Sequence, residues 1–159
     1  MNIFALSLDP RQAAEWHLDK HVVKMPLETA QLLCTALLHT KTVDNAPYKI
    51  THLNHPCSKW VRESTGNFQW LCNLGIELCK EYTYRYGKRH KCQDVIEWAK
   101  TQNLQVEKSD VTPFALAMPD DFKVSDGVES YRNYYVGAKA HIANWKLRSK
   151  PTWYGETHG

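Results

Sequence analysis

The segment DKHVVKMPLETAQ, residues 19–31, decides the predicted fold, because its polar and apolar side chains separate onto two sides of a helix. An α-helix turns by about 100° per residue, so side chains at related spacings share a face. The side predicted to face the core holds Trp16, Val23, Leu27, Ala30, Cys34 and Leu37. A neighbouring polar stripe holds His17, Lys20, His21, Lys24, Glu28 and Gln31. The segment therefore predicts a half-buried helix that carries hydrogen-bonding groups along one edge.

This helix is predicted to begin at Asp9-Pro10 and to end at about His39. Aspartate is a favoured N-cap, and proline is tolerated in the first turn because the N–H that it lacks would be unbonded there. Pro26 lies within the helix and is expected to kink it, since its ring disturbs the preceding turn and its missing N–H removes a hydrogen bond.

Further helices are predicted downstream, separated by residues that typically end helices. Asn54-His55-Pro56 begins a second, long helical region that is interrupted near residues 64–67 and ends at Gly87. Two shorter helices are predicted over residues 93–102 and from Asp126 to about Trp145. The remaining segments are predicted to be a short strand or extended arm (residues 2–8), a loop (40–53), an irregular connection with a packed part (103–126) and a tail (150–159).

The length of the chain, 159 residues, suits one domain with one hydrophobic core. The sequence contains no internal repeat, low-complexity tract or linker. We therefore predict a single domain over residues 1–159, an all-α compact bundle with a kinked first helix, a long second helix and a C-terminal helix followed by an irregular tail.

The composition predicts a soluble protein of the cytoplasm. Apolar residues make up 43% and charged residues 23%, which is typical of globular proteins. No segment approaches the roughly 20 apolar residues of a membrane span, and the start MNIFALSLDP does not resemble a signal peptide. The five cysteines form no C-x-x-C pair, so we expect reduced, mostly buried thiols.

Basic residues are concentrated in two parts of the chain, although the net charge is only +3. One group is Lys80, Arg85, Lys88, Arg89 and Lys91, and the other is Lys139, Lys146, Arg148 and Lys150. Tyrosine and tryptophan residues are interleaved with both groups. This pattern suits a nucleic acid, which offers phosphates to the cations and bases to the aromatic rings. An ordinary solvated surface is the alternative interpretation.

The polar stripe of the first helix also allows two interpretations. Lys20, Lys24 and Glu28 could form ordinary surface pairs, each contributing about 0.2–0.5 kcal/mol. However, Glu28 follows Lys24, which is the less favourable order, and two lysines one turn apart repel each other. We favour an acid–base or anion-binding surface. A metal site at His17 and His21 is the weaker hypothesis because the neighbouring lysines would repel a cation, so no metal or other cofactor is predicted.

Other candidate residues lie outside this stripe. Asn54 and His55 could cap the second helix or bind a phosphate at its N-terminus, and the sequence is compatible with both roles. Asp19 projects towards the apolar side of the first helix and is expected to pair with a buried donor.

The last helix and the tail supply further candidates. Tyr134 and Tyr135 are predicted to belong to the core, since tyrosines at helical spacing usually do. Aromatic residues near a chain end must be docked or exposed, and beside basic residues they are suited to stacking on bases. The residues predicted to contact DNA here are Arg132, Lys150, Trp153 and Tyr154.

Several features occur in a characteristic order along the chain. They are the spacing of His17-Leu18 and Pro26, a histidine before the second helix, the segment MPDDFK (residues 118–123) and the segment KPTWY (residues 150–154). In this order they resemble the pyrimidine-dimer DNA glycosylase/AP lyase family, the endonuclease V type carried by bacteriophages. The resemblance spans nearly the whole chain, and the segments DKHVVKMPLE and NHPCSKW are similar to a divergent phage and bacterial branch of that superfamily.

The resemblance implies a compact all-α enzyme that binds duplex DNA, bends it and extrudes a damaged or modified nucleotide. In that family an N-terminal α-amine attacks the sugar C1′, a carboxylate on the first helix stabilises the charged sugar, and the resulting imine permits β-elimination. No cofactor is implied. The expected protein is a monomer without a membrane partner, located in the cytoplasm of the bacterial host if a phage encodes it.

Carried over onto this sequence, the nucleophile of the family falls near the amine of Met1. The position of the family's catalytic glutamate is occupied by Lys24, and the nearest acid on the same sector is Glu28, one turn later. Glu28 could supply the carboxylate, Lys24 could itself form the imine, or Lys20 and Lys24 could hold phosphate without covalent chemistry. An α-amine suits nucleophilic attack because its ordinary pKa is about 7.7–8.0, compared with about 10.4 for lysine.

We therefore predict a DNA glycosylase/AP lyase with catalytic residues Met1, Lys24 and Glu28. The other residues predicted to contact DNA are His17, Lys20, His21, Gln31, Asn54, His55, Arg132, Lys150, Trp153 and Tyr154. Two alternatives are a nucleotide- or base-modifying hydrolase or transferase on the same scaffold and a DNA-binding module without catalysis.

Overall fold

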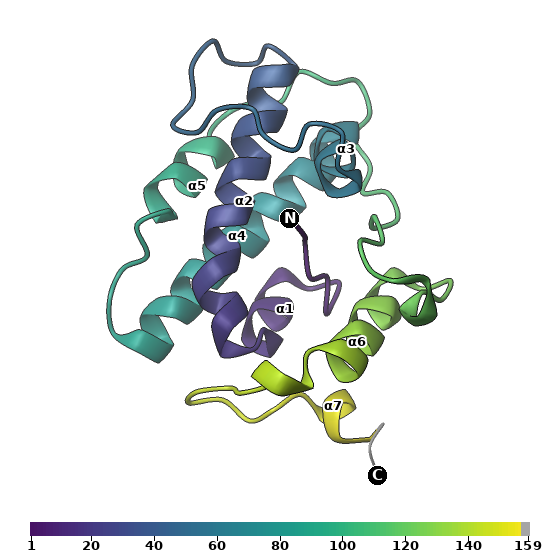
Figure 1. The fold of residues 1–159 in the computed structure, drawn as a ribbon. Helices are drawn as coiled ribbons and strands as arrows, with labels where there is room; N and C mark the ends of the chain where they lie inside the picture. The colour runs from purple at the N-terminus through teal and green to yellow at the C-terminus, as the bar shows by residue number, and fades with distance from the viewer. Residues whose placement is uncertain (157–159) are drawn as a thin grey trace.

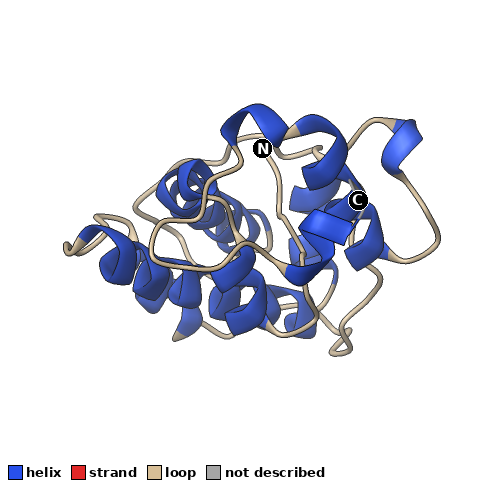
Figure 2. Cartoon of the chain, turned by 90° about the horizontal axis from the view of Figure 1, so that it is seen from below, coloured by secondary structure: helices blue, strands red, loops and turns tan. Residues whose placement is uncertain are grey.

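The polar-striped segment lies in α2 (Asp19–His39), the helix that crosses the middle of the molecule in Figure 1. The computed structural model describes residues 1–156, and no strand occurs among them. Figure 2 shows the helices and their connecting loops from a second direction. The other helices are α1 (Pro10–Trp16), α3 (Pro56–Glu63), α4 (Thr65–Tyr86), α5 (Gln93–Lys100), η1 (Asp120–Phe122), α6 (Gly127–Ala138), η2 (Ala140–Ile142) and α7 (Thr152–Glu156). The predicted all-α fold is confirmed.

The first helical region is interrupted where the sequence predicts it to be continuous. His17 and Leu18 have extended backbone angles, so α1 ends before them and α2 begins after them. The buried guanidinium group of Arg85 donates hydrogen bonds to the carbonyl oxygens of His17 and Glu15, at 2.8 and 2.9 Å. Carbonyl groups at a helix end need such partners, and Arg85 supplies them. The prediction of one helix is therefore wrong at residues 17–18, whereas α2 continues through Pro26.

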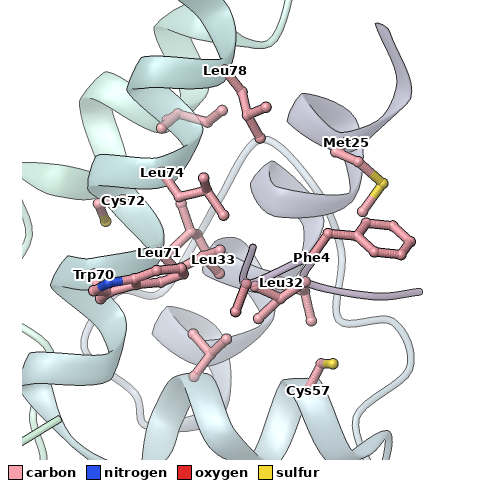
Figure 3. Close-up of a cluster of buried hydrophobic side chains, with 14 of the residues drawn as sticks. Phe4, Met25, Leu32, Leu33, Cys57, Trp70, Leu71, Cys72, Leu74 and Leu78 are labelled. Atoms are coloured by element: carbon pink, nitrogen blue, oxygen red, sulfur yellow. The ribbon is translucent and has the colours of Figure 1, made fainter. Parts of the chain in front are cut away.

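The core lies mainly between α2 and α4, which Figure 3 shows in close-up. Its buried leucines include Leu32 and Leu33 of α2 and Leu71, Leu74 and Leu78 of α4. Gly75 permits this close packing, because a Cβ atom there would lie 2.8 Å from the side chain of Thr29. The contact holds one side of α2 in the core and leaves its polar edge available to line a site.

Most of the predicted helix boundaries are confirmed. Asp9 caps α1 by accepting a hydrogen bond from the backbone N–H of Arg11. The break between α3 and α4 lies at Ser64, whose hydroxyl oxygen accepts the N–H of Asn67. Gly87 ends α4 with a left-handed φ of 69°, a conformation that favours glycine. α5 lies within its predicted range.

Two predictions about the periphery are corrected, and one is refined. α6 ends at Ala138 instead of continuing to about Trp145, and the following loop binds the start of α2 through a hydrogen bond from the Asp19 N–H to the Asn144 carbonyl oxygen. The predicted short irregular tail is present and includes one helical turn, α7, and its last three residues lie outside the described part of the chain. Val23, predicted to face the core, is 44% exposed.

The N-terminal arm, residues 2–8, is an extended segment rather than a strand. In Figure 1 it runs from the centre of the molecule beside α2 towards α1. Residues 3–6 are buried, so the arm belongs to the core and is not a loose end.

Cysteine burial agrees with the sequence. All five cysteines are buried and free, as predicted. Among the described residues, no helix is long and apolar enough to cross a membrane.

Candidate functional site

A pocket of about 480 Å³ opens where the N-terminal arm meets α2. The start of α3, residues 116–118 and the C-terminal end of α6 complete its walls. Its polar and charged groups come from Met1, Asn2, His21, Lys24, Glu28, His55 and Lys139. The pocket therefore brings together Met1, His21, Lys24, Glu28 and His55, five of the predicted site residues.

Asn2 anchors the arm so that Met1 lies in the pocket. Its backbone N–H donates to Glu28 Oε1 at 2.9 Å, and its side-chain amide donates to the carbonyl oxygen of Ala117 at 2.9 Å. The hydroxyl group of Tyr131 lies 3.1 Å from Asn2 Oδ1. Three different parts of the chain thus hold Asn2, which restricts the position of the preceding amine.

Glu28 is the acidic group of the pocket. The residue is 8% exposed, and its Oε1 lies 3.5 Å from the amine nitrogen of Met1. Its Oε2 lies 3.7 Å from Nζ of Lys24. The side chain of Met1 is 3% exposed and that of Lys24 is 71% exposed. The carboxylate therefore lies between a confined amine and a solvent-exposed one.

His55 has the capping role that the sequence allowed, and its alternative role of binding a phosphate stays a prediction. Its Nδ1 accepts the backbone N–H of Cys57 at 3.0 Å, which makes it the N-cap of α3. It also lines the pocket. Burial and the positive charge of the Met1 amine lower the pKa of His55, so that its imidazole is neutral at neutral pH.

His21 is the second histidine of the pocket. It is 7% exposed, and its Nδ1 lies 2.7 Å from the hydroxyl oxygen of Tyr135. Its ring stacks on Phe4 with a centroid separation of 4.2 Å. Burial, with smaller contributions from neighbouring positive groups, lowers the pKa of His21 to about 2. The imidazole is therefore uncharged at neutral pH.

His17 lies in the core instead of the pocket. It is fully buried, and its Nδ1–H donates to the carbonyl oxygen of Ala13 at 2.6 Å. Because His17 ends α1, it does not share the stripe of α2. A side chain without exposed surface does not contact DNA in this conformation, which corrects the prediction. In the described part of the chain, no three histidine, cysteine or acidic residues are grouped in a way that could hold a metal ion.

Four other predicted residues are placed outside the pocket lining. Lys20, Asn54 and Lys150 are exposed, and Gln31 is half-buried. Their predicted contacts to DNA stay predictions, because the pocket does not depend on them.

Arg132, Trp153 and Tyr154 make internal contacts. The guanidinium carbon of Arg132 lies 5.0 Å from the ring centroid of Trp16 and 5.6 Å from that of Trp153. Its Nε donates to the carbonyl oxygen of Leu6 at 3.0 Å, and Tyr154 is buried. These side chains dock the C-terminal segment and do not line the pocket, so their predicted contacts with DNA stay predictions.

Nine residues of the pocket lining were not predicted as site residues, and among them Phe4, Tyr134 and Lys139 form its aromatic and basic wall. Tyr134 was predicted to belong to the core, but it is half-buried and lines the pocket, with the Lys139 ammonium group 4.7 Å from its ring centroid. In the sequence, Lys139 was marked only as a member of a basic cluster. These residues meet through the packing of α6 against the arm, for which the local sequence gives no signal.

Comparisons of the chain with protein-family models, curated proteins and solved structures gave no match. The functional argument therefore depends on the residues and geometry of the pocket.

Proposed function

We propose that the protein is a DNA glycosylase/AP lyase in which the α-amine of Met1 forms an imine with the sugar of a damaged or modified nucleotide. The main support is the distance of 3.5 Å between that amine and the largely buried carboxylate of Glu28 in the wall of a pocket. A carboxylate beside an amine can accept its proton before attack and can then stabilise the positive charge that develops on the sugar.

Met1 is a better candidate nucleophile than Lys24. The Met1 amine is confined by the contacts of Asn2, whereas the Lys24 side chain is 71% exposed. An α-amine also has an ordinary pKa of about 7.7–8.0, so a larger fraction is unprotonated near neutrality than for a lysine. Lys24 is suited instead to binding a phosphate at the edge of the pocket.

The proposed reaction begins when the unprotonated amine bonds to C1′ while the bond from C1′ to the base breaks. The electron pair of that bond leaves with the base. One of the two N–H protons of the attached amine then passes through Glu28 to the departed base, and the other passes to the ring oxygen O4′ as the bond between C1′ and O4′ breaks, which opens the sugar ring and gives the imine. Removal of a proton from C2′ then breaks the bond between C3′ and the phosphate oxygen, and water hydrolyses the imine to restore the amine. Glu28 is assigned the proton transfers because it is the only acidic residue in the described pocket lining.

The charges and rings of the pocket fit an extruded nucleotide. Lys24, Lys139 and the Met1 amine outnumber the single carboxylate, which favours binding of DNA phosphates. Extruding a base costs a few kcal/mol. Stacking on the ring of Tyr134, which is half-buried and lines the pocket, would offset part of that cost.

Borohydride reduction tests the proposal, because it converts an imine into a stable covalent bond between protein and DNA. Intact-mass measurement first establishes that Met1 is the N-terminal residue of the purified protein. We expect a trapped adduct with duplexes that contain an abasic site or ultraviolet damage, and peptide mapping should locate the DNA on Met1. One residue added before Met1 displaces the amine and should abolish the adduct, whereas Lys24→Ala should retain it.

Other outcomes would support the alternatives. An adduct on Lys24 would identify that lysine as the nucleophile. Base release without an adduct would support a hydrolase or transferase. Salt-sensitive binding without either reaction would support a DNA-binding module.

A further inference from the structure

The hydrogen bonds of Tyr135 determine which nitrogen of neutral His21 carries the proton. The Tyr135 side chain is fully buried, and its hydroxyl oxygen accepts the backbone N–H of Leu18 at 3.4 Å. Among the described residues, the hydroxyl proton then has one acceptor, Nδ1 of His21 at 2.7 Å. Because Nδ1 accepts this bond, the proton of the neutral ring lies on Nε2.

Nε2 of His21 is available to a ligand. It has no hydrogen-bond partner among the described residues, although His21 lines the pocket. The fully buried polar side-chain atoms without a partner in the described part are Nε2 of His17 and Nε1 of Trp153, and Nε2 of His21 is not one of them. This nitrogen is therefore an N–H donor that is accessible from the pocket.

The donor lies in the aromatic part of the pocket. Phe4 stacks on His21, and the ring of Tyr134 lies 6.2 Å from that of Phe4 with an angle of 27° between their planes. The charged part contains the Met1 amine and Glu28, which are 3.5 Å apart. A planar base suits the aromatic part, and a sugar with its phosphates suits the charged part.

We propose that His21 recognises the departing base by donating a hydrogen bond from Nε2–H to one of its carbonyl oxygens. This inference rests on the proposed function and assigns the base-binding end of the same pocket. When the bond between C1′ and the base breaks, its electron pair passes to the base, and negative charge collects on the carbonyl oxygens. A fixed neutral donor binds such an oxygen more strongly as the charge grows, and it transfers no proton itself.

The charge state of the ring agrees with this role. Burial lowers the pKa of His21 to about 2, so the donor is the same at every pH near neutrality. The charged or titratable groups around it are His17 after α1, Lys24 on α2, and Tyr135 and Lys139 at the end of α6. The positive charge of the two lysines opposes protonation of His21.

The test separates base release from strand cleavage. His21→Phe retains a ring against Phe4 but removes the donor, so base release from a duplex carrying a pyrimidine dimer, uracil or an oxidised pyrimidine should fall on the order of 10²-fold. Cleavage of the same duplex with a preformed abasic site should be unchanged, because no base leaves. His21→Gln keeps an N–H donor and should recover part of the lost base release.

Nitrogen NMR of the wild-type protein provides a readout that does not depend on activity. We expect a protonated Nε2 and an unprotonated Nδ1 for His21 across the neutral pH range. A proton on Nδ1, a charged ring, or equal loss of base release and strand cleavage in His21→Phe would overturn the inference. The absence of base release and of trapped adducts in the wild type with all these duplexes would overturn the proposed function itself.

Discussion

Two buried carboxylates, Glu28 and Glu81, are both paired with positive groups, but their pairings differ. Glu81 accepts hydrogen bonds from Arg85 at 2.6 Å and from Arg148 at 2.8 Å. The other donors of Arg85 bind Asp19 and two backbone carbonyl oxygens. The cations around Glu28 lie farther away, at 3.5 and 3.7 Å. A fully bonded carboxylate stabilises the fold, whereas a loosely paired one beside a pocket can exchange partners with a substrate.

The presence of a cavity does not distinguish the two sites. A hollow of about 360 Å³ adjoins Glu81, but that carboxylate already has two arginine partners. Burial alone would raise the pKa of Glu81, but hydrogen bonds from Arg148 and Arg85 lower it. A structural ion cluster therefore differs from a candidate active site in how closely cations pair with its carboxylate, and not in whether a hollow lies beside it.

The largest effect should follow from breaking the Glu81 cluster. Arg85→Met would leave Glu81 with Arg148 as its partner, and it would remove one of two donors to Asp19 and the donors to the carbonyl oxygens at the end of α1. We expect a loss of about 3–5 kcal/mol in the free energy of unfolding, measured by urea denaturation. Lys80→Met removes an exposed ion pair with Glu77 and should cost less than about 1 kcal/mol. Equal losses in both variants would contradict the structural role of the cluster.

Substitution of Glu28 should reduce activity more than it reduces stability. Glu28→Gln keeps the shape of the side chain but removes its charge, and we expect imine formation to fall by about 10²–10³-fold. The yield of borohydride-trapped adduct over time measures this effect. Glu63→Gln, at an exposed carboxylate, is the matched control and should react at the wild-type rate. A wild-type rate in Glu28→Gln would remove Glu28 from the mechanism.

The two buried histidines should make the folded state sensitive to acid. Burial lowers the pKa of His17 to about 4 and that of His21 to about 2, whereas an unfolded histidine titrates near its ordinary value of 6.5. Below pH 6.5 the unfolded state therefore binds more protons, and stability falls as the pH falls. At pH 5 each histidine should cost about 2 kcal/mol relative to pH 8. Urea denaturation at both pH values measures the loss.

A variant sharpens this prediction. His21→Phe removes one of the two titrating groups and should show about half of the wild-type loss between pH 8 and pH 5. Equal stability of the wild type at the two pH values would contradict the burial of both rings as neutral species.

The smallest effect on stability is expected at Lys24. Its side chain is exposed and its pairing with Glu28 is long, so Lys24→Ala should change the free energy of unfolding by less than about 0.5 kcal/mol. If Lys24 binds a phosphate, the slope of log K for DNA binding against log salt concentration should be smaller in Lys24→Ala, by the amount that about one phosphate contact contributes. Fluorescence anisotropy at several salt concentrations measures this change, and an unchanged salt dependence would exclude the contact.

The sequence predicted well those features that depend on local periodicity and capping. The helices around Ser64 and Gly87 were predicted because cap residues act within one turn. The expected buried donor for Asp19 is Arg85, at 3.0 Å. The break at His17 was missed because it depends on Arg85, which is distant in sequence.

The candidate site could be predicted only in part for the same reason. Lys24 and Glu28 share one face of α2, so helical spacing was sufficient to group them. Lys139 and Tyr134 reach the pocket from α6 and its end, and no spacing relates them to α2. Arg132 and Trp153 were predicted to contact DNA, but in the structure they stack on each other. Composition alone does not distinguish these two arrangements of a cation and an aromatic ring.

Arg132 links two segments that are far apart in the sequence, which matters during synthesis. Its guanidinium group binds the arm through the Leu6 carbonyl oxygen and lies against the ring of Trp153. The ribosome makes the arm well before it makes Trp153. The arm that carries the Met1 amine therefore gains this support only after Arg132 and Trp153 have been synthesised, so a shorter nascent chain lacks these contacts around the amine.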